Sequence, residues 1–210
     1  MSDDPDHALR GFDVSRETRE RLEILVAELR RWQQIKNLVG PETLKEVWHR
    51  HIADSLQLAA LAPDARTWID LGSGAGFPGL VLGIQAAERA GHMVHLVESN
   101  GRKCAFLRHA ARATGAAVRV HDARLEDVVP SLVAGVDVVT ARALAPLPQL
   151  LAWTEPLLKN GALGLFPKGE GAAAELTEAA KSLRFNAETV VSRTDPRASI
   201  LRITWPRDPA

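Results

Sequence analysis

The feature of this sequence that most restricts its fold is a glycine-rich turn between a strand-like and a helix-like segment. The run Asp70-Leu71-Gly72-Ser73-Gly74-Ala75-Gly76-Phe77-Pro78-Gly79 follows the β-prone residues 67–69 and precedes the apolar stretch 80–90. Alternate glycines permit a tight turn and let backbone N–H groups approach a ligand closely. The run therefore predicts a strand–turn–helix unit whose turn binds a nucleotide-like ligand.

Strand-like and helix-like segments alternate along the rest of the chain from residue 67. We expect strands at 67–71, 93–97, 117–121, 136–140 and 161–166, and helices at 78–90, 101–114, 124–133, 146–158 and 171–184. Two last strands, at 187–192 and 199–205, have no helical pattern between them and should form an antiparallel hairpin. This order predicts an α/β, Rossmann-like fold with a seven-stranded, mostly parallel sheet that ends in an antiparallel hairpin.

The chain before the first strand is expected to be helical. Residues 1–14 look frayed, and Ser15 is a good N-cap for a helix whose apolar residues recur every three or four positions. Gly40-Pro41 should break this pattern, and a second helix should run to about residue 61. We expect residues 1–63 to form an N-terminal helical cap and residues 64–210 to form the cofactor-binding domain.

Composition restricts the class of protein. The 26 basic and 26 acidic residues balance, which argues against binding naked nucleic acid mainly through bulk charge. No apolar stretch is long enough to span a bilayer, and the N-terminus has no signal-like apolar core. We therefore expect a cytoplasmic protein that does not associate with a membrane. One local basic stretch could meet a nucleic acid or simply be a solvated helix face: Arg102, Lys103, Arg108, Arg112, Arg119 and Arg124.

Residues directly after the predicted strands indicate the cofactor, because ligands bind beyond the carboxyl ends of parallel strands. Gly72 and Gly74 follow the first strand, and Glu98 follows the second, where an acid can accept hydrogen bonds from ribose hydroxyls. The acid Asp70 before the glycines favours a ligand with a cationic amino-acid end. A dinucleotide remains the alternative, but about 65 helical residues precede the loop and no length remains for a second, catalytic domain. We therefore favour S-adenosylmethionine.

Motifs that the chain lacks restrict the methyl acceptor. Cys104, the single cysteine, falls inside a predicted helix, which disfavours methylation through a cysteine nucleophile and excludes a cysteine-built metal cluster. The fourth strand ends in Thr140-Ala141-Arg142-Ala143, not in the Pro-Pro-aromatic turn common among exocyclic-amine methyltransferases. The methyl acceptor can still be a ring nitrogen, an oxygen, or an amine that is methylated without that turn.

Five segments together resemble one family. They are Asn37-Leu38, Arg50-His51-Ile52-Ala53-Asp54-Ser55-Leu56, Gly76-Phe77-Pro78-Gly79, Thr140-Ala141-Arg142-Ala143 and Lys168-Gly169. In this order they resemble the RsmG family, also called GidB, of bacterial 16S rRNA guanine-N7 methyltransferases, over about residues 16–205. The resemblance implies methyl transfer from S-adenosylmethionine, with S-adenosylhomocysteine as product, to N7 of one guanine in the decoding region of 16S rRNA.

The resemblance also implies site residues. It carries cofactor contacts onto Gly72, Phe77, Leu125, Glu126 and Arg142. Val39, Ser73 and Thr140 depart mildly from the residues usual in the family, which leaves the assignment standing.

Chemistry adds candidates for the guanine and its phosphates. Guanine N7 and O6 are both hydrogen-bond acceptors and suit a cation, so Arg142, Lys168 and Arg197 are candidate substrate contacts, each of which could instead be a surface ion pair. No residue is assigned a catalytic role and no metal is expected. His51 and Asp54, one helical turn apart, are expected to tie the cap to the sheet and not to bind a metal.

Three functions stay open on the residues alone. They are an rRNA methyltransferase, a methyltransferase for a small molecule or protein with the cap as lid, and a nucleotide-binding sensor. For the first, the balanced charge favours 16S rRNA within the small subunit or an assembly intermediate, with no obligate protein partner.

Overall fold

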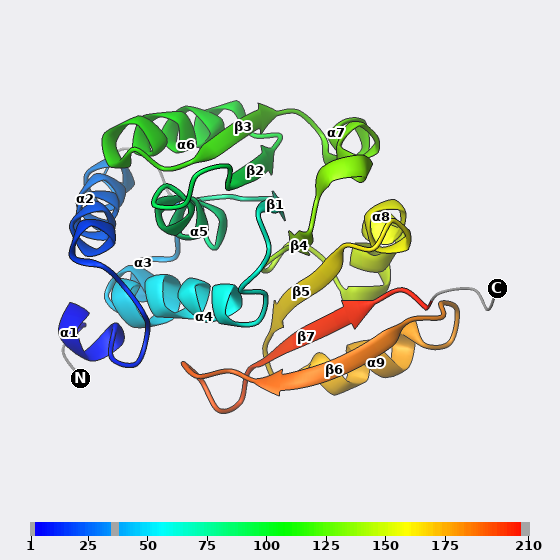
Figure 1. Cartoon of the computed structure of the whole chain (residues 1–210). Coiled ribbons are helices and arrows are strands. Elements are labelled where there is room, and N and C mark those ends of the chain that lie inside the picture. The colour runs from blue at the N-terminus through cyan, green and yellow to red at the C-terminus, as the bar shows by residue number, and fades with distance from the viewer. Residues whose placement is uncertain (1–2, 35–37, 207–210) are drawn as a thin grey trace.

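A seven-stranded sheet runs through the centre of the molecule. The computed structural model describes residues 3–34 and 38–206, so Asn37 of the family-like segments lies outside the described residues. The strand order is β3-β2-β1-β4-β5-β7-β6 (Figure 1). The strands are β1 (Thr67–Leu71), β2 (Met93–Glu98), β3 (Val118–Asp122), β4 (Val138–Thr140), β5 (Leu163–Lys168), β6 (Asn186–Val191) and β7 (Ser199–Thr204).

The pairing of the strands agrees with the sequence prediction. Strands β1 to β5 are mutually parallel, whereas β7 lies antiparallel between β5 and β6. The seven-stranded sheet and its C-terminal antiparallel hairpin are thus confirmed. Because the first five strands share one direction, their carboxyl ends and the loops that follow them meet at one edge.

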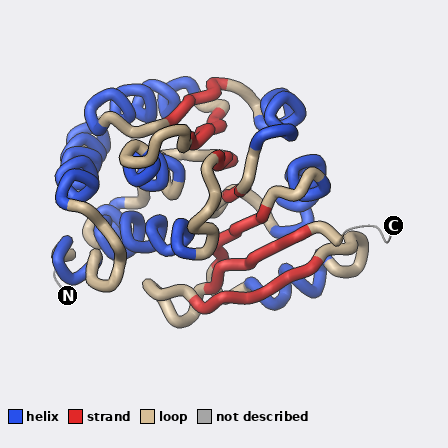
Figure 2. Tube along the Cα trace, in the orientation of Figure 1, coloured by secondary structure: helices blue, strands red, loops and turns tan. Residues whose placement is uncertain are grey.

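Helices cover both faces of the sheet (Figure 2). The domain helices are α5 (Gly79–Ala86), α6 (Gly101–Thr114), α7 (Leu125–Leu132), α8 (Leu147–Lys159) and α9 (Ala172–Ala179). Side chains of β1 alternate between two cores, as a strand's two-residue period requires. Trp68 belongs to the core shared with α5 and α6, and Ile69 and Leu71 belong to the core shared with α7, α8 and α9.

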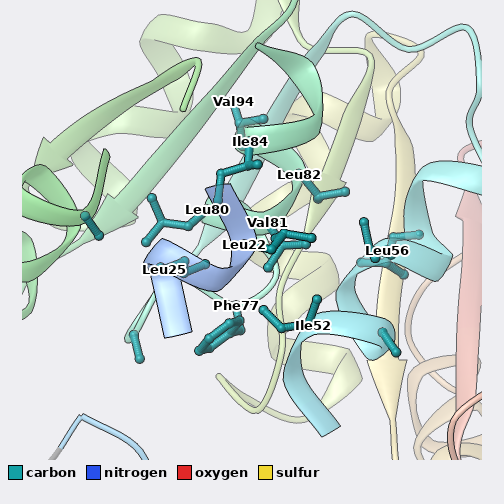
Figure 3. Packing of buried hydrophobic residues seen from close by; sticks show 14 of the residues in the cluster. Leu22, Leu25, Ile52, Leu56, Phe77, Leu80, Val81, Leu82, Ile84 and Val94 are labelled. Carbon is teal, nitrogen blue, oxygen red and sulfur yellow. The ribbon is translucent and has the colours of Figure 1, made fainter. Parts of the chain in front are cut away.

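The N-terminal helices join the first of these cores. They are α1 (Pro5–Ala8), α2 (Arg16–Gln33), α3 (Pro41–Leu44) and α4 (Asp54–Ala60). As predicted, Ser15 caps α2, with its hydroxyl accepting from the Thr18 N–H at 2.9 Å. Leu22 and Leu25 of α2 are fully buried near Leu80 of α5 and Phe77 of the glycine loop (Figure 3). The cap is therefore continuous with the core of the domain.

The prediction that residues 1–14 are frayed is wrong for the described residues 3–14. Residues 5–8 form helix α1, and Ala8 is buried in the core. The Asp3 carboxylate accepts hydrogen bonds from the backbone N–H groups of Trp48 and His49. Polar residues that look solvated in the sequence are held here by the backbone of a distant segment.

The predicted helix from residue 41 to about 61 is interrupted. After α3, residues Trp48–Ala53 form a π-helical turn that leads directly into α4. A π-helical turn holds one residue more per hydrogen-bonded ring than an α-helix and is frequent at functional sites. The carbonyl of Arg50 in this turn accepts from a side chain that lies 92 residues further along the chain, Arg142.

We propose that residues 1–63 are the cap and residues 64–210 the cofactor-binding domain. The boundary falls in the short turn between α4 and β1, where the Ala65 N–H donates to the Ala62 carbonyl at 3.2 Å. Within residues 3–34 and 38–206, no helix is long and apolar enough to cross a membrane.

Candidate functional site

The glycine loop forms a tight turn at the end of β1. Gly72, Gly74 and Gly76 have φ values of 66°, 57° and 89°, in the left-handed region that favours glycine. The Gly76 N–H donates to the Ser73 carbonyl at 2.7 Å, and the Ser73 N–H donates to the Val97 carbonyl at 3.0 Å. The loop is thus anchored to the neighbouring strand β2 before it enters α5.

Asp70 supports this loop from beneath. Its side chain is buried, and its Oδ2 accepts from the Gly79 N–H at 3.1 Å. Oδ1 has no hydrogen-bond partner within the described chain. Burial raises the pKa of Asp70 to about 7, although its hydrogen bonds and the Arg142 charge oppose the rise. The structure therefore places Asp70 under the loop, where it fixes the entry to α5.

A cavity of about 760 Å³ opens beside the loop. Its walls come from the glycine loop, the loop after β4, the end of β5, the cap and the loop between β6 and β7. Five of the residues predicted as site residues line it: Gly72, Gly74, Phe77, Arg142 and Lys168. The structure therefore brings together predicted site residues from three separate segments of the sequence.

Arg142 is bound to the cap. Its Nη1 donates to the Arg50 carbonyl at 3.0 Å and lies 3.3 Å from Asp54 Oδ2, and its Nη2 lies 2.7 Å from His51 Nδ1. The guanidinium carbon lies 5.6 Å from the centroid of the Phe77 ring, within the range of a cation–π contact. Burial lowers the pKa of Arg142, and the Asp54 carboxylate opposes this effect.

His51 connects the cap to the glycine loop. Its ring stacks on Phe77, with centroids 4.7 Å apart and an interplanar angle of 20°. Burial and the charges of Arg142 and Arg50 lower the pKa of His51 to about 3, so the imidazole is neutral near neutral pH. The expectation that His51 and Asp54 tie the cap to the sheet is thereby confirmed, through Arg142.

A buried polar network ties the cap to the hairpin loop. Gln57 Nε2 donates to Asp54 Oδ1 at 2.8 Å, and Gln57 Oε1 accepts from the Arg193 N–H at 2.9 Å. Thr194 donates from its hydroxyl to the same Asp54 oxygen at 2.9 Å. Ser192 lies 3.1 Å from Gln57 Nε2. The C-terminal wall of the cavity is therefore held by α4.

The two other candidate substrate contacts, Lys168 and Arg197, differ in their exposure. Lys168 is nearly buried at the cavity wall, where its Nζ donates to the Ala145 carbonyl at 2.8 Å and pairs with Glu175 at 2.7 Å. Arg197 is 70% exposed on the hairpin loop and pairs with Asp195 and Glu170, each at 3.2 Å. Lys168 is thus committed to internal partners, whereas Arg197 lies where a large substrate could reach it.

Three predicted cofactor residues lie at the end of β2 and directly after β3. Glu98 ends β2 and accepts from the Gly74 N–H at 2.9 Å and the Asn100 N–H at 2.8 Å. Leu125 and Glu126 begin α7 after β3, with Leu125 half-buried and Glu126 exposed. None of these three residues is among those that line the 760 Å³ cavity.

The residues fit the predicted cofactor. Glycines at positive φ leave the backbone of the loop uncovered by side chains, so a ligand can approach it. A Cβ at Gly74 would make only ordinary van der Waals contacts, so the space beside this glycine is open. The acid Glu98 ends the adjacent strand β2 and holds the Gly74 N–H. Cys104 is buried, and burial and Asp122 raise its pKa to about 11, which suits a structural thiol. In the described chain, no group of three or more His, Cys, Asp or Glu side chains is placed to hold a metal.

Sequence reasoning missed several partners of the site. Glu175, Gln57 and Thr194 carry no motif, and their roles depend on elements that meet only in the folded chain. The family-like segment from Arg50 to Ser55 did indicate functional residues, because it placed His51 and Asp54 in the cap. Which side chain they bind could not be read from it.

Comparisons with solved structures agree with the observed fold. An S-adenosylhomocysteine-bound methyltransferase of Podospora anserina, PaMTH1, superposes with a TM-score of 0.63 at 11% identity, covering 96% of this chain and 93% of its own. The O-methyltransferase TomG of Streptomyces achromogenes, solved with S-adenosylmethionine, gives 0.61 at 14% identity, covering 96% and 95%. At such identities the likeness concerns the fold, which is that of class I methyltransferases, as predicted.

Comparisons of sequence are more specific. Ribosomal RNA small subunit methyltransferase G of Methylobacterium radiotolerans is 62% identical over 203 residues, covering 96% of this chain and 95% of its own. The protein of the same name from Methylorubrum extorquens strain PA1 is 60% identical over 198 residues, covering 94% and 93%. The family model for rRNA small subunit methyltransferase G matches residues 18–200. The chain that builds this glycine loop and its cap-bound Arg142 thus belongs to the GidB family of rRNA small subunit methyltransferases.

Proposed function

We propose that this protein transfers the methyl group of S-adenosylmethionine to N7 of one guanine in 16S rRNA. The observation that supports this most directly is the cavity in which Gly72, Phe77 and Arg142 meet, in a chain of this family. S-adenosylmethionine, when bound, supplies an electrophilic methyl group on a sulfonium. Gly72, Gly74, Phe77, Glu98 and Arg142 are proposed to hold it, with Leu125 and Glu126 beside its adenine.

The chain's own contribution is placement and exclusion of water. Guanine N7 carries a lone pair and no proton, so no side chain has to remove a proton before the attack. Gly72, Gly74 and Phe77 line the cavity together with residues of the cap. Holding two reactants in line can lower a barrier by about 7–11 kcal/mol in favourable cases. Arg142 and Arg197 are proposed substrate contacts, with Lys168 supporting the wall.

A large, structured substrate suits the surface around the cavity. Residues of the cap and of the hairpin loop line the cavity, and the chain as a whole has no net charge. A protein without excess positive charge gains little from bulk attraction to RNA. We therefore propose the small subunit or an assembly intermediate as the substrate, and the cytoplasm as the location.

The test is to map the methylated nucleotide. Small subunits and naked 16S rRNA from a strain that lacks this enzyme would be incubated with the protein and S-adenosylmethionine carrying a labelled methyl group. We expect one labelled guanine, methylated at N7, and faster transfer to subunits or their intermediates than to naked rRNA. Absence of label from both RNAs, or label at another atom, would refute the proposal. Faster transfer to naked rRNA would refute only the choice of substrate particle.

A further inference from the structure

Among the described residues, His51 is the one uncharged side chain within hydrogen-bond distance of the Arg142 guanidinium. The other two partners are the Arg50 carbonyl and the Asp54 carboxylate. A guanidinium can only donate hydrogen bonds, so His51 Nδ1, 2.7 Å from Nη2, must accept with its lone pair. This contact selects the neutral tautomer that carries its hydrogen on Nε2.

The surroundings of His51 keep it in that state. The side chain is only 7% exposed, and a proton on Nδ1 would place two positive charges at 2.7 Å. The Nε2 atom is buried and has no hydrogen-bond partner in the described part of the chain. The imidazole therefore has one firm polar contact, the one to Arg142, together with its stack on Phe77.

Arg142 keeps donors for a ligand while it is held. Its Nη1 group serves the Arg50 carbonyl and Asp54, and one Nη2 hydrogen serves His51. A guanidinium has five N–H donors, so the Nε–H and the second Nη2–H are left without a partner among the described residues. Both belong to a side chain that lines the cavity.

We propose that His51 is a positioning residue for methyl transfer, which holds the Arg142 guanidinium and the Phe77 ring in one orientation at the cavity wall. The inference rests on the proposed function where it concerns turnover, and on the contacts alone where it concerns ligand binding. His51 moves no proton, because guanine N7 has none to lose. Its effect on the reaction passes through Arg142 and Phe77.

Two substitutions separate the acceptor from the ring. His51→Phe keeps an aromatic ring to stack on Phe77 but removes the acceptor, whereas His51→Asn can place an amide oxygen near the position of Nδ1. The affinity for S-adenosylhomocysteine would be measured by calorimetry, and kcat and KM with small subunits that lack the modification. His109→Phe, in α6 beside Glu28, is the matched control.

We expect His51→Phe to weaken S-adenosylhomocysteine binding or to lower kcat/KM by about 10-fold or more, since small misplacements of a binding group carry such losses. His51→Asn should recover most of that loss, and His109→Phe should match the wild type. Equal values for His51→Phe and the wild type would overturn the proposal. Equal defects in His51→Phe and His51→Asn would overturn it too, because the acceptor would then be irrelevant.

A measurement on the wild-type protein does not depend on how the variants fold. Nitrogen-15 NMR of histidine-labelled protein at neutral pH should show His51 with a bare Nδ1 and a protonated Nε2. A cationic ring, or a hydrogen on Nδ1, would overturn the proposal. A wild-type protein that binds S-adenosylhomocysteine but does not methylate rRNA would refute the proposed function alone, and the binding and NMR results would still decide the role of His51.

Discussion

The two walls of the cavity are built in different ways. The glycine-loop wall is made of backbone held by buried carboxylates, with Asp70 beneath Gly79 and Glu98 beside Gly74. The cap wall is made of side chains that hold one another, chiefly through Asp54, which binds both Gln57 and Arg142. The contacts of the first wall all lie within residues 70–98, whereas those of the second join residues up to 140 positions apart. They should therefore fail in different ways.

The glycine-loop wall should be the more sensitive to added volume. A Cβ at Gly79 would lie 2.2 Å from Leu96 Cδ2 and 2.6 Å from Asp70 Oδ2. Overpacking typically costs about 1–3 kcal/mol, and here it also displaces a buried carboxylate, so Gly79→Ala should lose about 3 kcal/mol or more. Urea unfolding measures the loss. Gly101→Ala is the control, because a Cβ there meets no described atom within 4 Å; similar losses in both variants would contradict the comparison.

The buried carboxyl group of Asp70, in the same wall, predicts that stability depends on pH. The folded pKa of Asp70 is raised to about 7, so between about pH 4 and pH 7 the folded state binds a proton that the unfolded chain releases. Stability should fall as pH rises through that window, by up to about 1.4 kcal/mol per pH unit from this group. Asp70→Asn should lack this slope.

The measurement compares unfolding free energies of the wild type and Asp70→Asn from about pH 5 to pH 8. His51, whose pKa is lowered to about 3, contributes the opposite slope between its folded value and its ordinary one, because there only the unfolded chain is protonated. Both proteins contain His51, so its contribution cancels in the difference. Parallel curves would show that Asp70 does not carry the pH dependence.

The cap wall should respond to the loss of polar contacts. Gln57→Leu removes the acceptor of the Arg193 N–H and a donor to Asp54, both in a buried network. Leaving such groups unpaired should cost about 1–2 kcal/mol and should loosen the hairpin loop. Urea unfolding and hydrogen exchange at residues 192–195 measure the two effects. Gln149→Leu on the exposed surface of α8 is the control, and equal losses would contradict a role for the network.

Arg197 lies outside both walls and should have the smallest effect on stability. Its pairs with Asp195 and Glu170 are exposed, so Arg197→Glu should leave the unfolding midpoint unchanged. If the loop meets RNA phosphates, the reversed charge should raise KM for small subunits about threefold or more while kcat stays the same. Arg184→Glu, an exposed charge before β6, is the comparison; an unchanged KM would remove Arg197 from the substrate contacts.

The same division explains what could be predicted from the sequence. The glycine-loop wall is local: β1, the turn and α5 are consecutive, and positive φ at Gly72 and Gly74 follows from residue type. The alternation of strands and helices likewise predicted the sheet, and the missing helix before β7 predicted the hairpin. These elements depend on patterns within about 20 residues.

The cap wall could be predicted only in part. The helical spacing of apolar residues predicts a packed cap, and Trp48 is indeed buried while Trp32 packs edge-on against Phe106, with ring centroids 5.6 Å apart. The π-helical turn was not predicted, because the group that binds its Arg50 carbonyl comes from beyond β4. Lys168 was predicted as a substrate contact or a surface ion pair, but the identity of its partner, Glu175 in α9, could not be predicted because no motif marks that residue.

The π-helical turn also sets an angular relation within the cap. One residue of an α-helix corresponds to a rotation of about 100° around the axis. A chain shortened by one residue within Trp48–Ala53 could keep a continuous helix, yet every side chain before the deletion would turn by that angle relative to those after it. Residues that now face the core and residues that now face Arg142 could then no longer do so together. The extra residue of the π-helical turn therefore sets the rotation between its two ends. With this rotation, one continuous helix can pack against the core that contains α2 and also contact Arg142 in the loop after β4.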